Sequence, residues 1–142
     1  MAYNFSENIQ RGILYLLKTN RDFYLQIVNL IKPEYFEFPS HSKIYEAVVR
    51  YYREYHKLPN DDFILQDVKI HLGERERVSD YEDEVELINR LDRSFIENPE
   101  YILDLIETFA KKEEMKSAIA KSIDLIKQDR VEEVEDLVRN AQ

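Results

Sequence analysis

Cysteine is absent from this chain of 142 residues. The absence excludes disulfide bonds, thiolate metal sites and cysteine nucleophiles together, and it suits a cytosolic protein. Long hydrophobic runs are also missing: the longest covers residues 13–17, whereas a membrane-spanning helix needs about 20 apolar residues. No basic region followed by a signal core opens the chain. We therefore expect no membrane association.

Residues that interrupt helices are scarce, with two glycines and four prolines in the whole chain. The alternating pattern of a half-buried strand is nearly absent as well, so we predict an all-α protein. Neither Gly12 nor Gly73 is followed by Lys-Ser or Lys-Thr, so the phosphate-binding loop GxxxxGK[ST] is missing. The chain therefore contains no ATPase site of that kind.

Acidic residues are concentrated in the second part of the chain. Residues 1–60 hold 8 Lys/Arg and 6 Asp/Glu, a net charge of +2, while residues 61–142 hold 12 and 23, a net charge of −11. The two parts sum to the −9 of the whole chain. Because an acidic surface repels phosphate, the composition disfavours tight, non-specific DNA binding and favours protein partners.

Residues 32–63 form an ordered segment of stop and start signals around one amphipathic helix. Pro33 prevents a helix from running through it. Pro39 stands before Ser40, a good N-cap, so a helix should begin near Ser40. The helix should end before Pro59, and Asn60 can cap the next one. The apolar face that we expect to be buried consists of Ile44, Ala47, Val48, Tyr51, Tyr52 and Tyr55.

This order of residues resembles the N-terminal domain of the DnaB-type replicative helicases. In that family a Pro-Glu-Asp-Phe-like turn precedes a helix with the pattern His-x-x-Ile-Phe/Tyr and then a further proline. Tyr35 replaces the commoner aspartate, and the Glu-rich opening of cellular members is missing, so the short phage versions are the better match. The resemblance covers residues 6–72 and, by helix pattern, residues 98–142. The residues that carry the motif are Pro33, Phe36, His41, Ile44, Tyr45 and Pro59.

The remaining cap signals predict a compact bundle of about five helices over residues 1–97. Ser6 and Asn20 can cap the first two helices, Ser79 begins a capping box with Glu82, and Gly73 is a stop signal. The buried stripe expected after Asn60 is Phe63, Ile64, Asp67, Val68, His71 and Leu72, and the next is Tyr81, Val85, Ile88, Leu91 and Phe95.

Asn98, Pro99 and Glu100 are a strong helix start. We predict a long helix over residues 98–127, a turn at 128–130 and a second helix over 131–141. In the family, the fold is a bundle followed by an antiparallel helical hairpin. The long helix should bury a seam at Ile102, Leu105, Ile106 and Phe109, which resumes at Ile119, Ile123 and Ile126.

The hairpin has two interpretations. Its apolar residues either only hold the two helices together or also pair with a second subunit, since no third helix is left to cover them. The resemblance implies the second, because family hairpins pack between protomers into a collar that recruits primase. The candidate self-association residues are Ile119, Ile123, Ile126, Val134, Leu137 and Val138.

Arg50, Arg53 and Lys57 alternate with tyrosines, a pattern that can clamp single-stranded nucleic acid. Helical spacing instead predicts that the tyrosines lie in the core and the basic residues on the solvent-exposed face. A weak contact between these basic residues and nucleic acid remains the alternative interpretation. His41, His56 and His71 lie fifteen residues apart without metal-ligand spacing, so we expect no metal site. The acids that we interpret as a solvated helix start are Asp80, Glu82, Asp83, Glu84 and Glu86.

The resemblance implies a collar domain that assembles a replicative helicase ring and docks primase or a loader. The expected partners are further copies of the chain, from dimer to hexamer, with DNA reached only through the full-length ring. ATP and Mg would belong to a C-terminal motor that this chain lacks, so it holds no cofactor and is not an enzyme by itself. The cytoplasm of a bacterium or phage-infected host is expected. The alternative is a stand-alone small acidic helical regulator that binds a replication protein.

Overall fold

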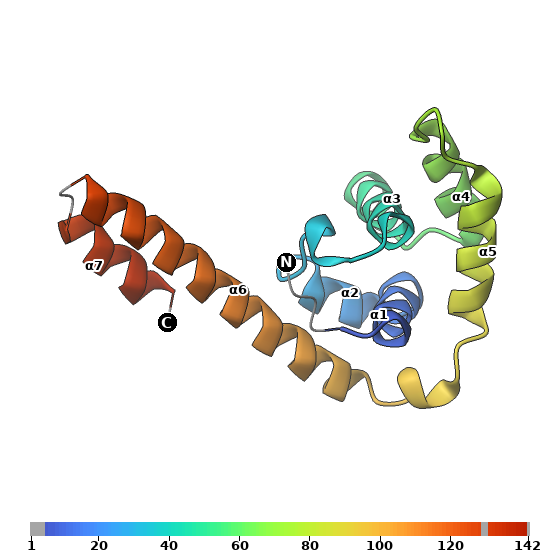
Figure 1. The fold of residues 1–142 in the computed structure, drawn as a ribbon. Helices are drawn as coiled ribbons and strands as arrows, with labels where there is room; N and C mark the ends of the chain where they lie inside the picture. The colour runs from blue at the N-terminus through green and yellow to red at the C-terminus, as the bar shows by residue number, and fades with distance from the viewer. Residues whose placement is uncertain (1–4, 129–130, 142) are drawn as a thin grey trace. The chain divides into compact units, whose positions relative to one another are not determined.

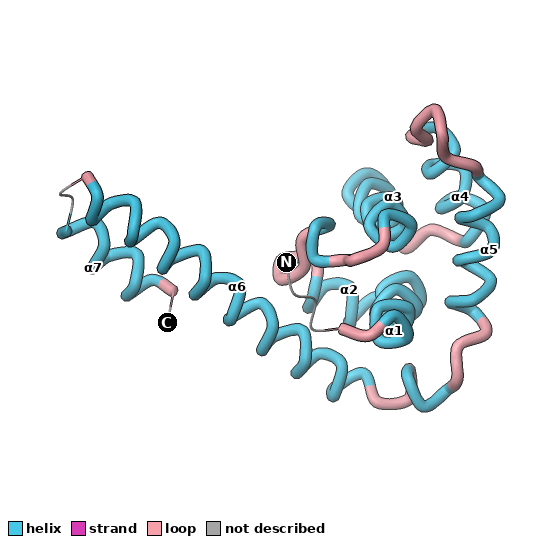
Figure 2. The backbone as a smooth tube through the Cα atoms, viewed as in Figure 1, coloured by secondary structure: helices cyan, strands magenta, loops and turns pink. Residues whose placement is uncertain are grey.

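The computed structural model describes residues 5–128 and 131–141, and all regular structure in these ranges is helical. The prediction of an all-α protein is confirmed. Figure 1 shows the course of the chain, and Figure 2 shows that short loops join the helices. The α-helices are α1 (Glu7–Thr19), α2 (Arg21–Ile27), α3 (Pro39–Tyr55), α4 (Asp61–Ile70), α5 (Val78–Asn89), α6 (Pro99–Lys127) and α7 (Val131–Asn140). Two short 3-10 helices are η1 (Pro33–Tyr35) and η2 (Arg93–Phe95).

The chain divides into two compact units, Met1–Leu103 and Asp104–Gln142. The division falls inside α6, whereas the helix start at Asn98 predicts a boundary between residues 97 and 98. Because α6 is a continuous helix of 29 residues, the end of the first unit is not marked by a loop. No helix in the part of the chain that the structure describes is long and apolar enough to cross a bilayer.

The first unit has its core where α1, α3 and α5 meet. Each of these three helices contacts the other two, while α2 packs on α1, and α4 contacts both α3 and α5. The side chains at the centre are fully buried aliphatic residues contributed by all five helices. They are Ile13, Leu14, Leu17, Ile27, Ile44, Val48, Ile64 and Ile88.

Four of the predicted N-caps are confirmed. The Ser6 hydroxyl accepts a hydrogen bond from the Ile9 amide at 3.1 Å and begins α1. Side-chain oxygens of Asn20, Asn60 and Asn98 accept in the same way from the amide three residues later, at 3.1, 2.9 and 3.2 Å. These caps begin α2, α4 and α6.

Two predicted caps are wrong. Ser40 lies inside α3, because Pro39 takes the first helical position, where its missing N–H costs nothing, and Phe38 is the cap residue. Ser79 likewise lies inside α5, which begins at Val78 with Arg77 as its cap residue. Gly73 does not end α4, which stops at Ile70.

The predicted buried faces are only partly correct. Tyr55 and Phe63 are 55% and 49% exposed. Tyr51 is half-buried and stacks on Phe63 with ring centroids 5.5 Å apart, so these aromatic residues cover one another at the surface between α3 and α4. His71 is exposed as well. The stripe predicted on α4 was too wide, because α4 buries only a narrow face, at Ile64 and Val68.

In the second unit, α7 runs back in the direction opposite to α6 (Figure 1). The turn predicted at 128–130 lies largely outside the described residues, which include Gln128 but neither Asp129 nor Arg130. Helix α7 ends at Asn140, one residue before the predicted end.

Candidate self-association surface

Three isoleucines form an exposed apolar stripe on the C-terminal half of α6. Ile119, Ile123 and Ile126 are 49%, 49% and 56% exposed. Their spacing of four and three residues puts them within about 60° of one another around the helix. The C-terminal half of α6 therefore presents one continuous aliphatic strip to solvent, which we call the isoleucine stripe.

The buried face of this part of α6 carries small residues instead. Ala118 and Ser122 are only 6% and 7% exposed, and the Ser122 hydroxyl donates a hydrogen bond to the Ala118 carbonyl at 2.8 Å. Each of these residues precedes an isoleucine of the stripe, so the two faces are about 100° apart. The expectation that the isoleucines continue the buried seam of α6 is therefore wrong. The more N-terminal seam residues Ile102, Ile106 and Phe109 are buried as expected.

The apolar face of α7 is also incompletely covered. Val134, Leu137 and Val138 are all half-buried and recur at helical spacing. A groove of about 420 Å³ lies beside this face, lined by Val134 and Val138 together with Glu135 and Arg139. The six candidate self-association residues thus all retain accessible apolar surface in a single copy of the chain.

Charges of opposite sign accompany these two apolar faces. Residues 111–127 of α6 hold five lysines and three acids, a net charge of +2. Residues 131–140 of α7 hold four acids and one arginine, a net charge of −3. Complementary potentials of this kind orient two surfaces as they meet.

Except for Pro59, which follows the end of α3, the motif residues of the first unit gather around the start of α3. Phe36, His41, Ile44 and Tyr45 are buried, as is Pro59, while Pro33 is half-buried. The Phe36 ring lies 5.4 Å from the Tyr45 ring and 6.3 Å, edge-on, from the His41 ring. The Tyr45 hydroxyl donates to the Ile31 carbonyl at 2.8 Å. These contacts hold the segment before α3 in place, so these motif residues have a structural role.

A buried polar network links α1, α3 and α5. His41, which is fully buried, contacts the Gln10 oxygen through Nδ1 at 2.9 Å and the Glu84 carboxylate through Nε2. The Arg11 guanidinium lies 3.2 Å from the same carboxylate. Both ring nitrogens of His41 thus face oxygen atoms of neighbouring side chains. Gln10 in turn donates to the Phe5 carbonyl at 3.1 Å.

This network corrects the interpretation of Glu84 as a solvated acid, because its side chain is 8% exposed and turns inward. Burial raises the pKa of the Glu84 carboxyl, but hydrogen bonds from His41 and Arg11 and their charges lower it more, so the net pKa lies below the ordinary value. The sequence did not reveal the network because its members lie far apart in the chain. Nor did the residue types of the first helix show that Gln10 is fully buried.

The three histidines do not come together. His41 is buried, whereas His56 and His71 are exposed at the C-terminal ends of α3 and α4. His56 adopts a left-handed backbone conformation with φ 56°, which ends α3. Among residues 5–128 and 131–141, no group of three or more His, Asp or Glu side chains is placed to hold a metal ion.

The three basic candidates for nucleic-acid binding have different surroundings. Arg50 is held by Asp67, with Nη2 2.5 Å from Oδ1, and lies 3.5 Å from Glu46. The hydrogen bond with Asp67 raises the pKa of the Arg50 guanidinium. Arg53 and Lys57 are exposed. Arg50 is therefore largely occupied within the fold, and the nucleic-acid contact stays a prediction.

No known protein family, no curated protein and no solved structure matches this chain. The resemblance to the helicase domain therefore stays a hypothesis that depends on residues 33–59 and on the features of α6 and α7.

Proposed function

We propose that this chain is the N-terminal collar domain of a DnaB-type, phage-like replicative helicase, and that copies of it associate through a hairpin formed by α6 and α7. The observation that carries the proposal is the isoleucine stripe, Ile119, Ile123 and Ile126, exposed by about half on a helix whose buried face is filled by other residues. Contiguous exposed apolar surface of this kind marks an interaction site.

The magnitude of the stripe sets the expected strength of association. Fully burying an isoleucine contributes about 1.5–3 kcal/mol, so covering the exposed half contributes roughly 1 kcal/mol per residue. Three isoleucines on each of two copies then supply roughly 6 kcal/mol, against an association cost of about 4–15 kcal/mol. The stripe alone supports weak association at best, and the apolar face of α7 must contribute as well.

The charges favour a contact in which α6 of one copy meets α7 of another. Lysines accompany the isoleucine stripe, and acids accompany Val134, Leu137 and Val138. An approach of two like faces would instead bring charges of the same sign together. On this proposal the association weakens as salt concentration rises, because the charges are exposed.

The other parts of the proposal derive from the resemblance. The collar would dock primase or a helicase loader, and DNA would be reached only through the complete ring. Because the chain has no phosphate-binding loop, ATP and Mg would be bound by a motor elsewhere in the full-length protein.

Light scattering over a series of protein concentrations tests the proposal. We expect the mass of the chain to rise with concentration above that of one copy. Ile123→Lys should shift the curve toward the monomer, because a buried lysine opposes association. Leu87→Lys is the matched control, since Leu87 has the same 49% exposure but lies on α5. A mass of one copy at millimolar concentration would contradict the proposal.

A second candidate is a stand-alone acidic regulator that binds a replication protein, which the net charge of −9 favours. The natural reading frame beyond Gln142 distinguishes the two candidates. A frame that continues into a phosphate-binding loop supports the helicase domain, and a stop codon directly after Gln142 supports the regulator.

A further inference from the structure

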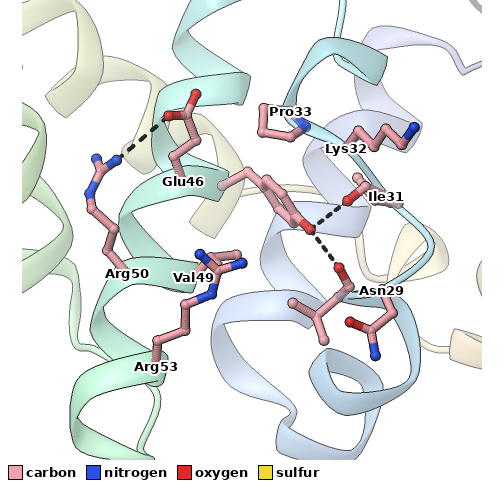
Figure 3. Close-up of a pocket in the computed structure, with 10 residues that line it drawn as sticks. Asn29, Ile31, Lys32, Pro33, Glu46, Val49, Arg50 and Arg53 are labelled. Atoms are coloured by element: carbon pink, nitrogen blue, oxygen red, sulfur yellow. Dashed lines mark hydrogen bonds and ion pairs between the residues drawn. The ribbon is translucent and has the colours of Figure 1, made fainter.

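A pocket of about 420 Å³ opens between the end of α2, the segment after it and the middle of α3. Figure 3 shows its lining: Arg50 and Arg53 extend from α3, and Lys32 lies on the other side of the pocket with its ammonium group turned away from Arg53. The pocket belongs entirely to the first unit and shares no residue with the isoleucine stripe.

Two of the cations at this pocket have no ion-pair partner among the described residues. Lys32 and Arg53 are both exposed and form no hydrogen bond or salt bridge there. The third cation, Arg50, is held by Asp67 and Glu46. The lining contains three cations and one acid, a net charge of +2 in a chain whose net charge is −9. A local positive site within an acidic protein attracts an acidic ligand.

Apart from Asn29, the rest of the lining is apolar or holds polar groups that are bonded within the fold. Val49 is buried and Val28 is half-buried, and both line the pocket. The Tyr45 hydroxyl donates to the carbonyls of Ile31 at 2.8 Å and Val28 at 3.3 Å, which holds the wall in place. Burial raises the pKa of this hydroxyl, so it remains a donor at neutral pH. The pocket thus offers free cations at its rim and aliphatic side chains within.

We propose that this pocket binds an acidic peptide segment of a partner protein, with a carboxylate at the Arg53 guanidinium and an aliphatic side chain against Val28 and Val49. Charge-assisted hydrogen bonds to the guanidinium would orient the carboxylate. The aliphatic contact would add the apolar burial that a free anion lacks. The proposal does not depend on the identity of the chain as a helicase domain.

The lining favours a peptide over a nucleic acid. A phosphate backbone would place further negative charges beside Glu46 and the carbonyls of the α2 C-terminus, and would leave Val28 and Val49 without an apolar partner. A nucleic acid, which is longer than the pocket, would also be repelled by the net charge of −11 on residues 61–142. A short peptide meets only the local field of the pocket, because charges beyond about 10 Å are screened at moderate salt.

Fluorescence anisotropy with the whole chain tests the proposal. The probe is a labelled peptide in which glutamate alternates with leucine, and its control is the same peptide with glutamine in place of glutamate. We expect saturable binding of the acidic peptide and at least tenfold weaker binding of the neutral one. Arg53→Glu should weaken binding at least tenfold, and Arg75→Glu, at an exposed arginine outside the pocket, should change it less than twofold.

Three results would overturn the proposal. The first is an absence of saturable binding by the acidic peptide. The second is equal weakening by Arg53→Glu and Arg75→Glu, because the effect would then come from net charge alone. The third is competition by inorganic phosphate or by single-stranded oligothymidylate at least as strong as that by unlabelled acidic peptide. Far-UV circular dichroism of both variants verifies that they remain folded.

Discussion

Replacing Glu84 by glutamine removes a buried negative charge from the junction of α1, α3 and α5. The carboxylate accepts hydrogen bonds from His41 and from Arg11, whose side chain is 15% exposed. In the Glu84→Gln variant, two donors face an uncharged amide that satisfies them only in part. Removing one partner of a buried charge pair costs about 3–5 kcal/mol. Because Arg11 retains some solvent, we expect about 3 kcal/mol.

The effect is measured by urea unfolding and by thermal unfolding, both followed by far-UV circular dichroism. For a chain of this size, about 1 kcal/mol shifts the melting temperature by roughly 3–4 °C, so the variant should melt about 10 °C below the wild type. Glu82→Gln is the control, since Glu82 is an exposed acid on the same helix and its loss should change stability by less than about 0.5 kcal/mol.

The pH dependence gives a second measure of the same contact. The pKa of Glu84 is lowered in the folded protein, so its contribution to stability is present above the unfolded pKa of about 4.3 and is lost as pH falls through the folded value. The stability difference between wild type and Glu84→Gln should therefore be largest near neutral pH and shrink in acid. A difference below about 1 kcal/mol at neutral pH, or one that grows in acid, would refute the reasoning.

Three smaller changes test the packing around α3 and α4, all read from urea midpoints. Tyr45→Phe removes the donor to the Ile31 carbonyl and should cost roughly 1 kcal/mol; no change would mean that the connector is not held by this bond. Asn60→Ala removes the cap of α4 and should cost about 1 kcal/mol, whereas Asn60→Gly should cost only a few tenths. Arg50→Ala should cost less than about 1 kcal/mol, since its side chain is 37% exposed; a larger loss would show that its pair with Asp67 is structural.

Local interactions were predictable from the sequence because both partners lie within one helical turn. The caps at Ser6, Asn20 and Asn60 need only a side-chain oxygen and an amide three residues later. The cap at Ser79 failed because its neighbour Val78 is already helical; the cap residue is Arg77, whose side chain forms no cap hydrogen bond, so residue type did not mark this helix start.

Interactions between distant residues were not predictable in the same way. In the sequence Glu84 is one acid among five, and its contacts with Arg11 and His41, 73 and 43 residues earlier, show that it points inward. The isoleucine stripe is an intermediate case. Periodicity located it on one face, but alanine and serine on the neighbouring face gave no sign that they, and not the larger side chains, are the buried ones.

The reactivity of a single introduced thiol tests most directly whether copies of the chain cover the isoleucine stripe. The natural chain has no cysteine, so Ile123→Cys and Leu87→Cys each carry one thiol, at positions where the natural side chains are equally exposed. We expect the rate of maleimide labelling at position 123 to fall as protein concentration rises, while the rate at position 87 stays constant. Equal, concentration-independent rates at the two positions would contradict self-association through α6.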